Sequence, residues 1–393
     1  SDDDPSANWH GTGVAGVMAA AANPDDTNPL YCGVGAAYDA KIAGLYILDD
    51  GLTDAIEAAS LSYFPNDIHI YNNSWGPTDN GHVLEAPGAL AKAAIQNGAL
   101  NGRNGLGSIY VWAAGNGGLT DNVNADGYSN SIYTIAVCAS TNLGIRYYYS
   151  EPGAAMLVTA PSDGGTAGIT TTDYWNGYDC WDDFGGTSSA SPLAAGVIAL
   201  MLEANPNLTW RDVQHLLVQN AEKIDAAHAD WQTNGAGYEF NHYYGFGRID
   251  AGAAVAAAVD WETVPPMTSY ASPVKEVNAA IPQDAGAPLT SVINVPDNFV
   301  VEQVEIVVNA THPVRGQIHI NLTSPNGMVS KMIFNRPDGG ANYTNWKMST
   351  VASWDEGSAG DWTLSLWDRT SDGNVGTLVD WKLIVWGYEG EIA

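Results

Sequence analysis

The pattern of apolar residues changes once along this chain, and the change determines which folds are open to it. Up to about residue 261, short and nearly continuous apolar runs alternate with segments whose apolar residues recur with the period of a helix. Such strands, separated by helices, are typical of a parallel sheet covered on both faces. Strands are expected at 40–48, 67–74, 107–115 and 131–139, and helices at 52–64 and 87–100.

Three more helices are expected before residue 261. One opens near Ser188 and carries Pro192 in its first turn, where proline is tolerated. The next has Thr209 as its N-cap, with Asp212 three residues later as a capping-box acid. The last covers residues 250–261. Together these patterns predict an α/β domain over residues 1–261.

A different pattern begins near residue 275. Residues 262–274 are rich in Pro and Ser and are expected to be a linker. Beyond them, polar and apolar residues alternate with period 2 between Gly, Asn, Asp and Pro turns. Residues 275–393 are therefore expected to form an all-β sandwich.

The charge of the chain limits its partners. It carries 44 acidic and 14 basic residues among 393, for a net charge of −30. Such a field repels nucleic acid and anionic membranes and attracts cations and basic peptides. The same net charge also fits an acidic secreted protein whose charge keeps it soluble. No apolar run reaches membrane-spanning length, so no membrane span is expected.

Three short segments carry candidate catalytic residues. Ser188 follows Gly-Gly-Thr at a helix start, which puts a hydroxyl beside free backbone N–H groups; a random serine there is usually only an N-cap. Asn116 ends an apolar strand among glycines; it is either a turn residue or an amide donor for an oxyanion. His10 precedes Gly-Thr at the start of an apolar helix and is placed to accept a proton.

Taken together and in this order, these segments resemble the kexin and furin branch of the subtilase superfamily of serine proteases. The resemblance includes "NDIHIYNNSWGPTDNG", "NADGYSNSIYT" and "LEANPNLTWRDVQHLLVQ" and covers nearly all of residues 9–261. The segments "HPVRGQIHINLTSPNG" and "TVASWDEGSAGDWTLSLWD" resemble the P domain that follows the protease in this branch. Together the two resemblances imply a subtilisin-like parallel sheet with flanking helices, followed by a jelly-roll sandwich.

The resemblance implies an acyl-enzyme mechanism, with Ser188 as nucleophile, His10 as general base and then acid, and Asn116 as oxyanion donor. The family's third catalytic residue is an aspartate on a core strand well before the histidine. The acids Asp2, Asp3 and Asp4 are too close to His10 for that role, and Asp49 and Asp50 follow it. We therefore expect a processed or truncated chain that lacks the triad aspartate and at least one strand of the sheet.

Three acids from separate segments suggest a metal site. Each of Asp79, Asp121 and Glu151 by itself would be a solvated loop acid, but together they would repel one another unless a hard cation held them. The resemblance implies Ca²⁺ at these positions. It also suggests a second Ca²⁺ site, whose candidate ligands are Ala21, Asn28, Tyr31 and Gly33.

Further acids imply recognition of basic substrates. Asp126 matches the floor of the primary specificity pocket in the family, where a carboxylate would select Arg or Lys. The resemblance assigns six other residues to substrate binding, namely Glu57, Glu85, Tyr128, Ser74, Trp75 and Gly76. A second basic subsite would need an aspartate where this chain has Ala7, so a dibasic requirement is not expected.

The three cysteines allow at most one disulfide. Cys138 lies inside an apolar strand and is expected to be a buried thiol. The resemblance implies that Cys32 pairs with Cys180, which fits secretion or another oxidising compartment.

These observations lead to a secreted, calcium-dependent serine endopeptidase that cleaves after Arg or Lys. Its partners would be a basic peptide or protein and, in addition, a propeptide, a chaperone or the missing N-terminal segment. The alternative is an inactive fragment or nicked chain, or a binding module built on the protease fold. Tryptophans at 346, 354, 362 and 367 would serve such a module as a platform, or would instead be core and inter-domain contacts.

Overall fold

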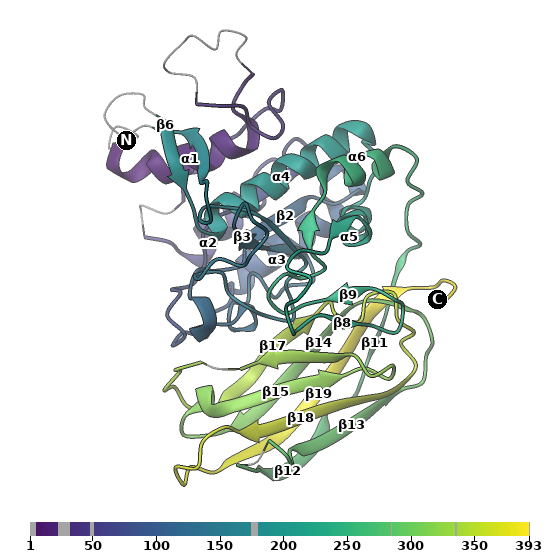
Figure 1. The fold of residues 1–393 in the computed structure, drawn as a ribbon. Coiled ribbons are helices and arrows are strands. Elements are labelled where there is room, and N and C mark those ends of the chain that lie inside the picture. The colour runs from purple at the N-terminus through teal and green to yellow at the C-terminus, as the bar shows by residue number, and fades with distance from the viewer. Residues whose placement is uncertain are drawn as a thin grey trace.

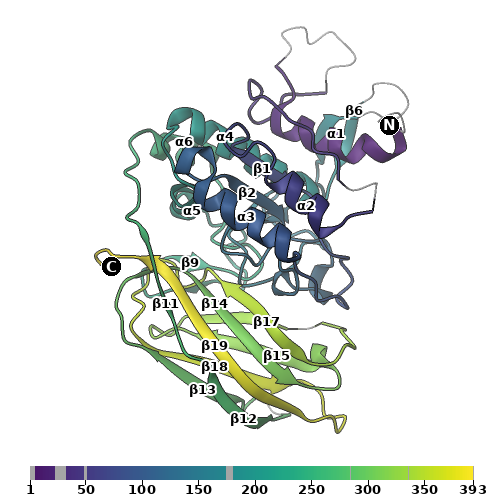
Figure 2. The ribbon, with the colours of Figure 1, turned by 180° about the vertical axis from the view of Figure 1, so that it is seen from behind.

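The computed structural model describes residues 5–22, 32–47, 51–173, 180–283, 285–334 and 336–392. They form an α/β unit and a β-sandwich that lie against each other (Figures 1 and 2). Helix α4 packs across one face of the central sheet, while α3 and its neighbour α2 lie on the other. The helices of the described residues are α1 (Pro5–Ala19), α2 (Asp54–Leu61), α3 (Ala89–Asn101), α4 (Thr187–Ala204), α5 (Trp210–Gln219) and α6 (Ala251–Val259).

The central sheet has the strand order β1–β2–β3–β4–β10–β7. All neighbours are parallel except β7, which pairs antiparallel with β10. Every residue of β2 and β3 is buried, because helices cover both faces. The predicted parallel α/β sheet is confirmed. Its strands are β1 (Ile70–Asn73), β2 (Ile109–Ala113), β3 (Thr134–Ser140), β4 (Val158–Pro161), β7 (Ala221–Glu222) and β10 (Arg248–Ile249).

The strand expected at 40–48 was wrong for the residues described there. Residues 40–47 have no regular secondary structure and are mostly exposed. β1 is the edge of the sheet, and in the described part of the chain no strand pairs with its outer side. An apolar run becomes a stable strand only where a neighbour satisfies its backbone N–H and C=O groups. In the part of the chain that the structure describes, no strand lies beside segment 40–47 to do so.

Helix α1 begins earlier than expected and is fixed to the short hairpin of β5 (Ile169–Thr172) and β6 (Cys180–Phe184). The Oγ1 atom of Thr171 donates to the carbonyl of Gly13 at 2.7 Å. A disulfide joins Cys32 to Cys180, as predicted, and Cys138 is a buried free thiol, also as predicted. Because α1 starts at Pro5, His10 lies in its second turn and not at its start.

The starts of α4 and α5 test two predictions about helix termini. At α5 the capping box is present: Thr209 Oγ1 accepts from the N–H of Asp212, whose carboxylate accepts from the N–H of Thr209. At α4 the first helical residue is Thr187, so Pro192 lies in the second turn and not in the first. Of the described residues, α4 alone is long and apolar enough to cross a membrane, and 67% of it is buried in the protein.

The remaining chain forms a two-layer β-sandwich. One layer has the order β11–β19–β14–β17, with β12 also paired to β19, and the other has the order β13–β18–β15–β16. Inward-facing residues of both layers make one apolar core. The strands are β11 (Met267–Ala271), β12 (Lys275–Ile281), β13 (Leu289–Val295), β14 (Val300–Thr311), β15 (Ile318–Thr323), β16 (Val329–Ile333), β17 (Tyr343–Thr350), β18 (Gly360–Asp368) and β19 (Gly376–Tyr388). A further short hairpin, β8 (Gln232–Thr233) with β9 (Glu239–Phe240), lies in the α/β unit.

The segment expected to be a linker at 262–274 therefore contains a strand. Its residues 267–271 form β11, which pairs antiparallel with the long strand β19. The alternating residues of this short segment extend the sandwich, and residues 260–266 connect α6 to β11 without regular structure.

The two units share apolar contacts as well as polar ones. Trp354 and Val351 of the sandwich belong to the apolar core of the α/β unit, and Ala154 belongs to that of the sandwich. Trp354 and Trp362 are fully buried, and Trp346 Nε1 donates to the carbonyl of Asn124 at 2.9 Å. For these three tryptophans the core and inter-domain alternative holds, which argues against an exposed platform.

Candidate active site

The amino end of α4 lies against the loop that follows β2. Asn116 Oδ1 accepts hydrogen bonds from the backbone N–H of Thr187 at 2.8 Å and from its hydroxyl at 3.1 Å. The hydroxyl of Thr187 is also an acceptor, from the N–H of Gly115 at 3.3 Å. Gly186, just before the helix, has φ +76°, a conformation that favours glycine. Ser188 and Asn116, predicted to act together, are thus brought to the same corner of the sheet.

The backbone of Ser188 is held by a hydroxyl from the end of β1. Pro192 has no N–H, so the Ser188 carbonyl has no partner from the residue four positions on. The Oγ of Ser74 donates to this carbonyl at 3.0 Å and accepts from Asn72 Nδ2 at 3.1 Å. Asn72 Oδ1 accepts in turn from Ser191 Oγ at 2.7 Å. This closed set of bonds ties α4 to β1.

His10 is partly buried beside the β5–β6 hairpin. Its ring lies edge-on to Phe184 with centroids 5.8 Å apart, and burial lowers the pKa of its imidazole. No hydrogen bond joins the ring to Ser188 or to a carboxylate among the described residues. The acids weighed as its partner, Asp2 to Asp4 and Asp49 and Asp50, lie outside those residues.

Another Asp–His pair in the structure has a structural role. His242 Nδ1 lies 2.7 Å from Asp230 Oδ2, while His242 Nε2 accepts from the backbone N–H of Lys331 at 2.8 Å. Both ring nitrogens are therefore occupied, and burial lowers the pKa of the ring. The pair connects the α/β unit to the sandwich.

A pocket next to this corner is lined by acids. Asp126 Oδ1 accepts from the N–H of Tyr128 at 2.7 Å and Oδ2 from Ser129 Oγ at 2.6 Å. Loss of solvent raises the pKa of Asp126 to about 7, although these bonds oppose the shift. The pocket is lined by Pro77, Thr78, Asp79, Val83, Ala114, Gly115, Asp121, Asn122, Ala125, Asp126 and Glu151.

Three of the residues assigned to substrate binding, Tyr128, Glu85 and Gly76, lie next to Asp126. Tyr128 stacks on Trp112 with centroids 5.0 Å apart, lies edge-on to Trp75, and donates through its hydroxyl to Glu57 at 2.7 Å. Burial raises the pKa of Glu57, and the Tyr128 hydroxyl partly opposes that effect. Two other residues assigned to substrate binding, Glu85 and Gly76, approach Asp126 through their backbone atoms. Glu85 pairs with Asp126 in an isolated bridge, and a Cβ on Gly76 would lie 3.6 Å from Asp126 Oδ2.

The three predicted metal ligands line the same pocket. Asp79 Oδ2 accepts from the N–H of Asn116 at 2.9 Å, and Glu151 Oε1 from that of Gly117 at 2.9 Å. Burial, followed by the charges of Asp121 and Asp79, raises the pKa of Glu151 well above its usual value. A Cβ on Gly115 would collide with the Glu151 carboxylate, so the glycine leaves room for that carboxylate beside the backbone.

The donor chemistry of these acids suits Ca²⁺, because excess carboxylate charge and hard oxygen atoms share one pocket. The oxygens, however, face separate backbone N–H groups and, at Asp121, the guanidinium group of Arg336. No three acidic, His or Cys side chains among the described residues are grouped as metal ligands. For the second predicted site, Asn28 and Tyr31 lie outside the described residues. Ala21 is exposed and Gly33 is half-buried with φ +106°.

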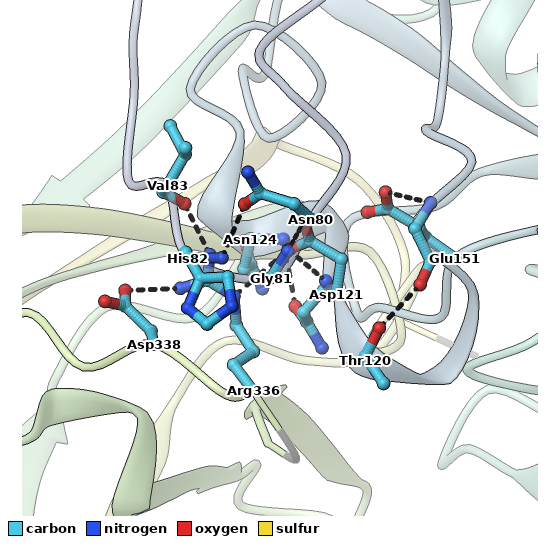
Figure 3. A network of polar contacts seen from close by, with 12 residues as sticks. Asn80, Gly81, His82, Val83, Thr120, Asp121, Asn124, Glu151, Arg336 and Asp338 are labelled. Atoms are coloured by element: carbon cyan, nitrogen blue, oxygen red, sulfur yellow. Dashed lines mark hydrogen bonds and ion pairs between the residues drawn. The ribbon is translucent and has the colours of Figure 1, made fainter.

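Sequence reasoning missed the residues that support the site from behind. Asn72, Thr187 and Ser191 are small polar residues that only the tertiary structure brings beside Ser188. Arg336 was also missed: it comes from the sandwich, yet its Nε lies 3.0 Å from Asp121 Oδ1 (Figure 3). Nothing in the local sequence of Arg336 indicates a contact with a residue 215 positions away.

A parallel sheet with helices on both faces, and a serine at the start of its core helix, are features of subtilisin-like serine proteases. The chain belongs to the subtilase family, whose model matches residues 1–247, and a proprotein convertase P-domain model matches residues 301–385. It is similar to furin-1 of Xenopus laevis (43% identical, covering 98% of this chain and 49% of that protein). It is also similar to proprotein convertase subtilisin/kexin type 5 of Homo sapiens (40% identical, 97% and 21%).

The solved structures agree on the fold. The serine protease of Aeromonas sobria, in complex with its chaperone, matches with a TM-score of 0.88 and 22% sequence identity, covering 99% of this chain and 82% of that one. At this identity the likeness concerns the fold alone. The chain spans about half the length of the furin relatives that it matches.

Proposed function

We propose that this chain forms the protease and P domains of a secreted, calcium-dependent serine endopeptidase that cleaves after Arg or Lys. The observation that carries the proposal is the hydrogen bond between Asn116 and the amino end of α4, next to a pocket that Asp126 lines. The disulfide between Cys32 and Cys180 supports an oxidising compartment. Membership of the subtilase family supports the reaction class.

In this proposal the Ser188 hydroxyl attacks the carbonyl carbon of the scissile bond. His10 takes the hydroxyl proton and later delivers it to the leaving amine, after which water releases the acyl group from Ser188. The side-chain amide of Asn116 and the N–H at the start of α4 stabilise the charge that develops on the carbonyl oxygen. The bond from Thr187 to Asn116 Oδ1 supports this role, because it turns the amide nitrogen away from Thr187.

The Asp126 carboxylate selects the substrate side chain. A guanidinium or ammonium group that enters the pocket meets a carboxylate with little solvent around it, so their attraction is only weakly screened. Glu57 and Glu85 extend the negative charge along the cleft and favour further basic residues in the substrate.

The amidine p-aminobenzamidine, a mimic of the arginine head group, tests Asp126. Asp126→Asn is expected to weaken its binding by about 2–5 kcal/mol, because the buried cation then lacks a counter-charge. A carboxyl group with a raised pKa is charged only above that value. Wild-type affinity should therefore fall as the pH drops through about 7, and the variant should show no such dependence. Titration of probe fluorescence across this pH range measures both effects.

The control for this test is Asp67→Asn, which removes the same charge from an exposed position at the amino end of β1. It should bind the amidine as the wild type does. Equal affinity of Asp126→Asn and the wild type at pH 8 would assign recognition of the cation to another residue.

Calcium binding is proposed at Asp79, Asp121 and Glu151, where the ion would neutralise charge behind the pocket. Ligand that binds only the folded state stabilises it by about 2.7 kcal/mol at 100 times its Kd, which a thermal melt detects. In Glu151→Gln this gain should be lost at this site. Burial and the charges of Asp121 and Asp79 disfavour the charged form of Glu151 and raise its pKa, so a neutral amide at this position removes a cost to the calcium-free fold.

The variant should therefore melt at or above the wild-type temperature in chelator, yet below it in saturating calcium. Any calcium-dependent gain that remains belongs to the second proposed site. A variant with the full wild-type gain would show that calcium does not bind at Glu151. Exposed Glu262→Gln is the control for the change of charge.

A further inference from the structure

Arg336 is a cation from the P domain that is buried against the protease domain. It follows β16, and its side chain is 1% exposed. Nε donates to Asp121 Oδ1 at 3.0 Å, Nη1 donates to Asp338 Oδ2 at 3.1 Å, and Nη2 donates to the carbonyl of Val83. Figure 3 shows Arg336 among these three partners. Two of the three belong to the protease domain.

Val83 and Asp121 stand on two separate segments that wall the pocket of Asp126. The first segment, 77–87, carries Val83, and the second, 114–126, carries Asp121. Asp121 Oδ2 also accepts from the N–H of Gly81 at 2.7 Å, so the carboxylate bonded to Arg336 reaches across to the first segment. At the far end of the same wall, Glu85 and Asp126 form a backbone bridge. The guanidinium group and this bridge therefore join the same two segments at two points.

The neighbouring residue of Arg336 contacts the same wall. Gly81 has φ +72°, and a Cβ there would collide with the carbonyl of Thr120 and the ring of Pro337. The backbone of Gly81 thus lies directly between the second segment and the P-domain loop. The contact of this loop with the pocket wall involves packing as well as charge.

An arginine is suited to this place because its planar group has five donors in a fixed fork. Here the fork serves acceptors on three segments at once, and a lysine ammonium cannot span them in one plane. Two carboxylates, Asp121 and Asp338, balance the buried charge. Arg315 also pairs with Asp338, at 2.7 Å, but its other acceptor is the carbonyl of Ala341 in the same domain.

We infer that Arg336 is a positioning residue for the primary specificity pocket. It acts through Asp121 and Val83, and it holds the two pocket walls in the spacing at which Asp126 meets the side chain of a basic substrate. Docking of the P domain is thereby coupled to substrate recognition and does more than stabilise the fold. The inference rests on the proposed function, because it takes Asp126 as the group that binds the cation.

The experiment measures p-aminobenzamidine affinity in the full chain, well below the melting temperature of each variant. Arg336→Gln removes the charge and leaves the walls without their common donor, so Kd should rise roughly tenfold, a size usual for coupled sites. Arg336→Lys keeps the charge and should give an intermediate Kd. Arg315→Gln is the matched control, since it removes a cation from the same Asp338 without touching the protease domain, and its Kd should stay that of the wild type.

Binding stoichiometry separates positioning from stability. A variant that is only less stable binds less probe in total, but its folded fraction keeps the wild-type Kd. An unchanged Kd in Arg336→Gln overturns the inference, and if that variant does not fold, an unchanged Kd in Arg336→Lys overturns it. A wild-type chain that does not bind the probe would instead contradict the proposed function.

Discussion

Ser188→Ala should remove covalent labelling by a fluorophosphonate and lower kcat by about 10⁶-fold, the effect of losing the nucleophile in other Ser-His-Asp proteases. The folded protein should be unaffected. The Ser188 hydroxyl forms no hydrogen bond among the described residues, and only its backbone carbonyl is held, by Ser74. Melting temperatures of the variant and the wild type should therefore agree, and mass spectrometry of labelled protein gives the loss of reactivity.

The adjacent serine is the matched control. Ser189 Oγ is buried and lies 2.7 Å from Ser162 Oγ and 3.2 Å from the carbonyl of Gly186. Ser189→Ala should lose about 1 kcal/mol of unfolding free energy, because a buried hydrogen bond is removed, and should still accept the label. Labelling of Ser188→Ala, or loss of labelling in a folded Ser189→Ala, would contradict the assignment of the nucleophile.

The same reagents separate the alternatives for this chain. A wild-type chain that binds the amidine but takes no label would favour a binding module on the protease fold. A chain that is labelled while a separate N-terminal segment is bound to it, and that loses the label when this segment is removed, would favour a nicked enzyme. His10 makes this comparison necessary, because in the described residues its ring has no carboxylate to fix the tautomer.

Local patterns predicted the elements whose partners lie within the described chain. The buried strand β2 and the capping box at Thr209 are examples, because their signals are an apolar run and a three-residue spacing. The strand at 40–48 failed for the opposite reason: strand formation depends on a neighbour, and an apolar run does not reveal whether one is present. The strand β11 was missed because its short run lies in a segment rich in Pro and Ser.

The site was predicted to the extent that single residue types indicate chemistry. Asp79, Asp121 and Glu151 were predicted to form a calcium site and Asp126, from the resemblance, a specificity pocket; in the structure all four line one pocket. No local sequence pattern indicated the contacts that involve backbone atoms. The bond from Ser74 to the Ser188 carbonyl depends on the missing N–H of Pro192, and the contact of Arg336 depends on how the P domain docks. Such contacts follow from tertiary structure and not from spacing.

The P domain is attached to the protease chiefly through buried groups, so its docking should depend strongly on charge. Glu302 on β14 accepts from Arg211 Nε at 2.9 Å and Nη2 at 2.6 Å, and lies 2.7 Å from His215 Nε2. Burial alone would raise the pKa of Glu302, but its bonds with His215 and Arg211 hold it below the usual value. A carboxylate with a depressed pKa contributes stability above its unfolded pKa and loses it as the pH falls through the folded value.

Glu302→Gln should therefore cost about 3–5 kcal/mol at neutral pH, because Arg211 then stays buried without a counter-ion. Glu305→Gln is the control on the same strand, since Glu305 pairs with Lys347 inside the P domain and not across the interface. Residues 262–266 are mostly exposed but held by hydrogen bonds from Arg211 Nη1 to the carbonyl of Pro265 and from the N–H of Val264 to Asp212. Undocking of the domains would release this segment to fit a protease, so Glu302→Gln should be nicked there faster than wild type or Glu305→Gln. Equal nicking rates and melting temperatures in both variants would show that the pair across the interface contributes no more than one within the sandwich.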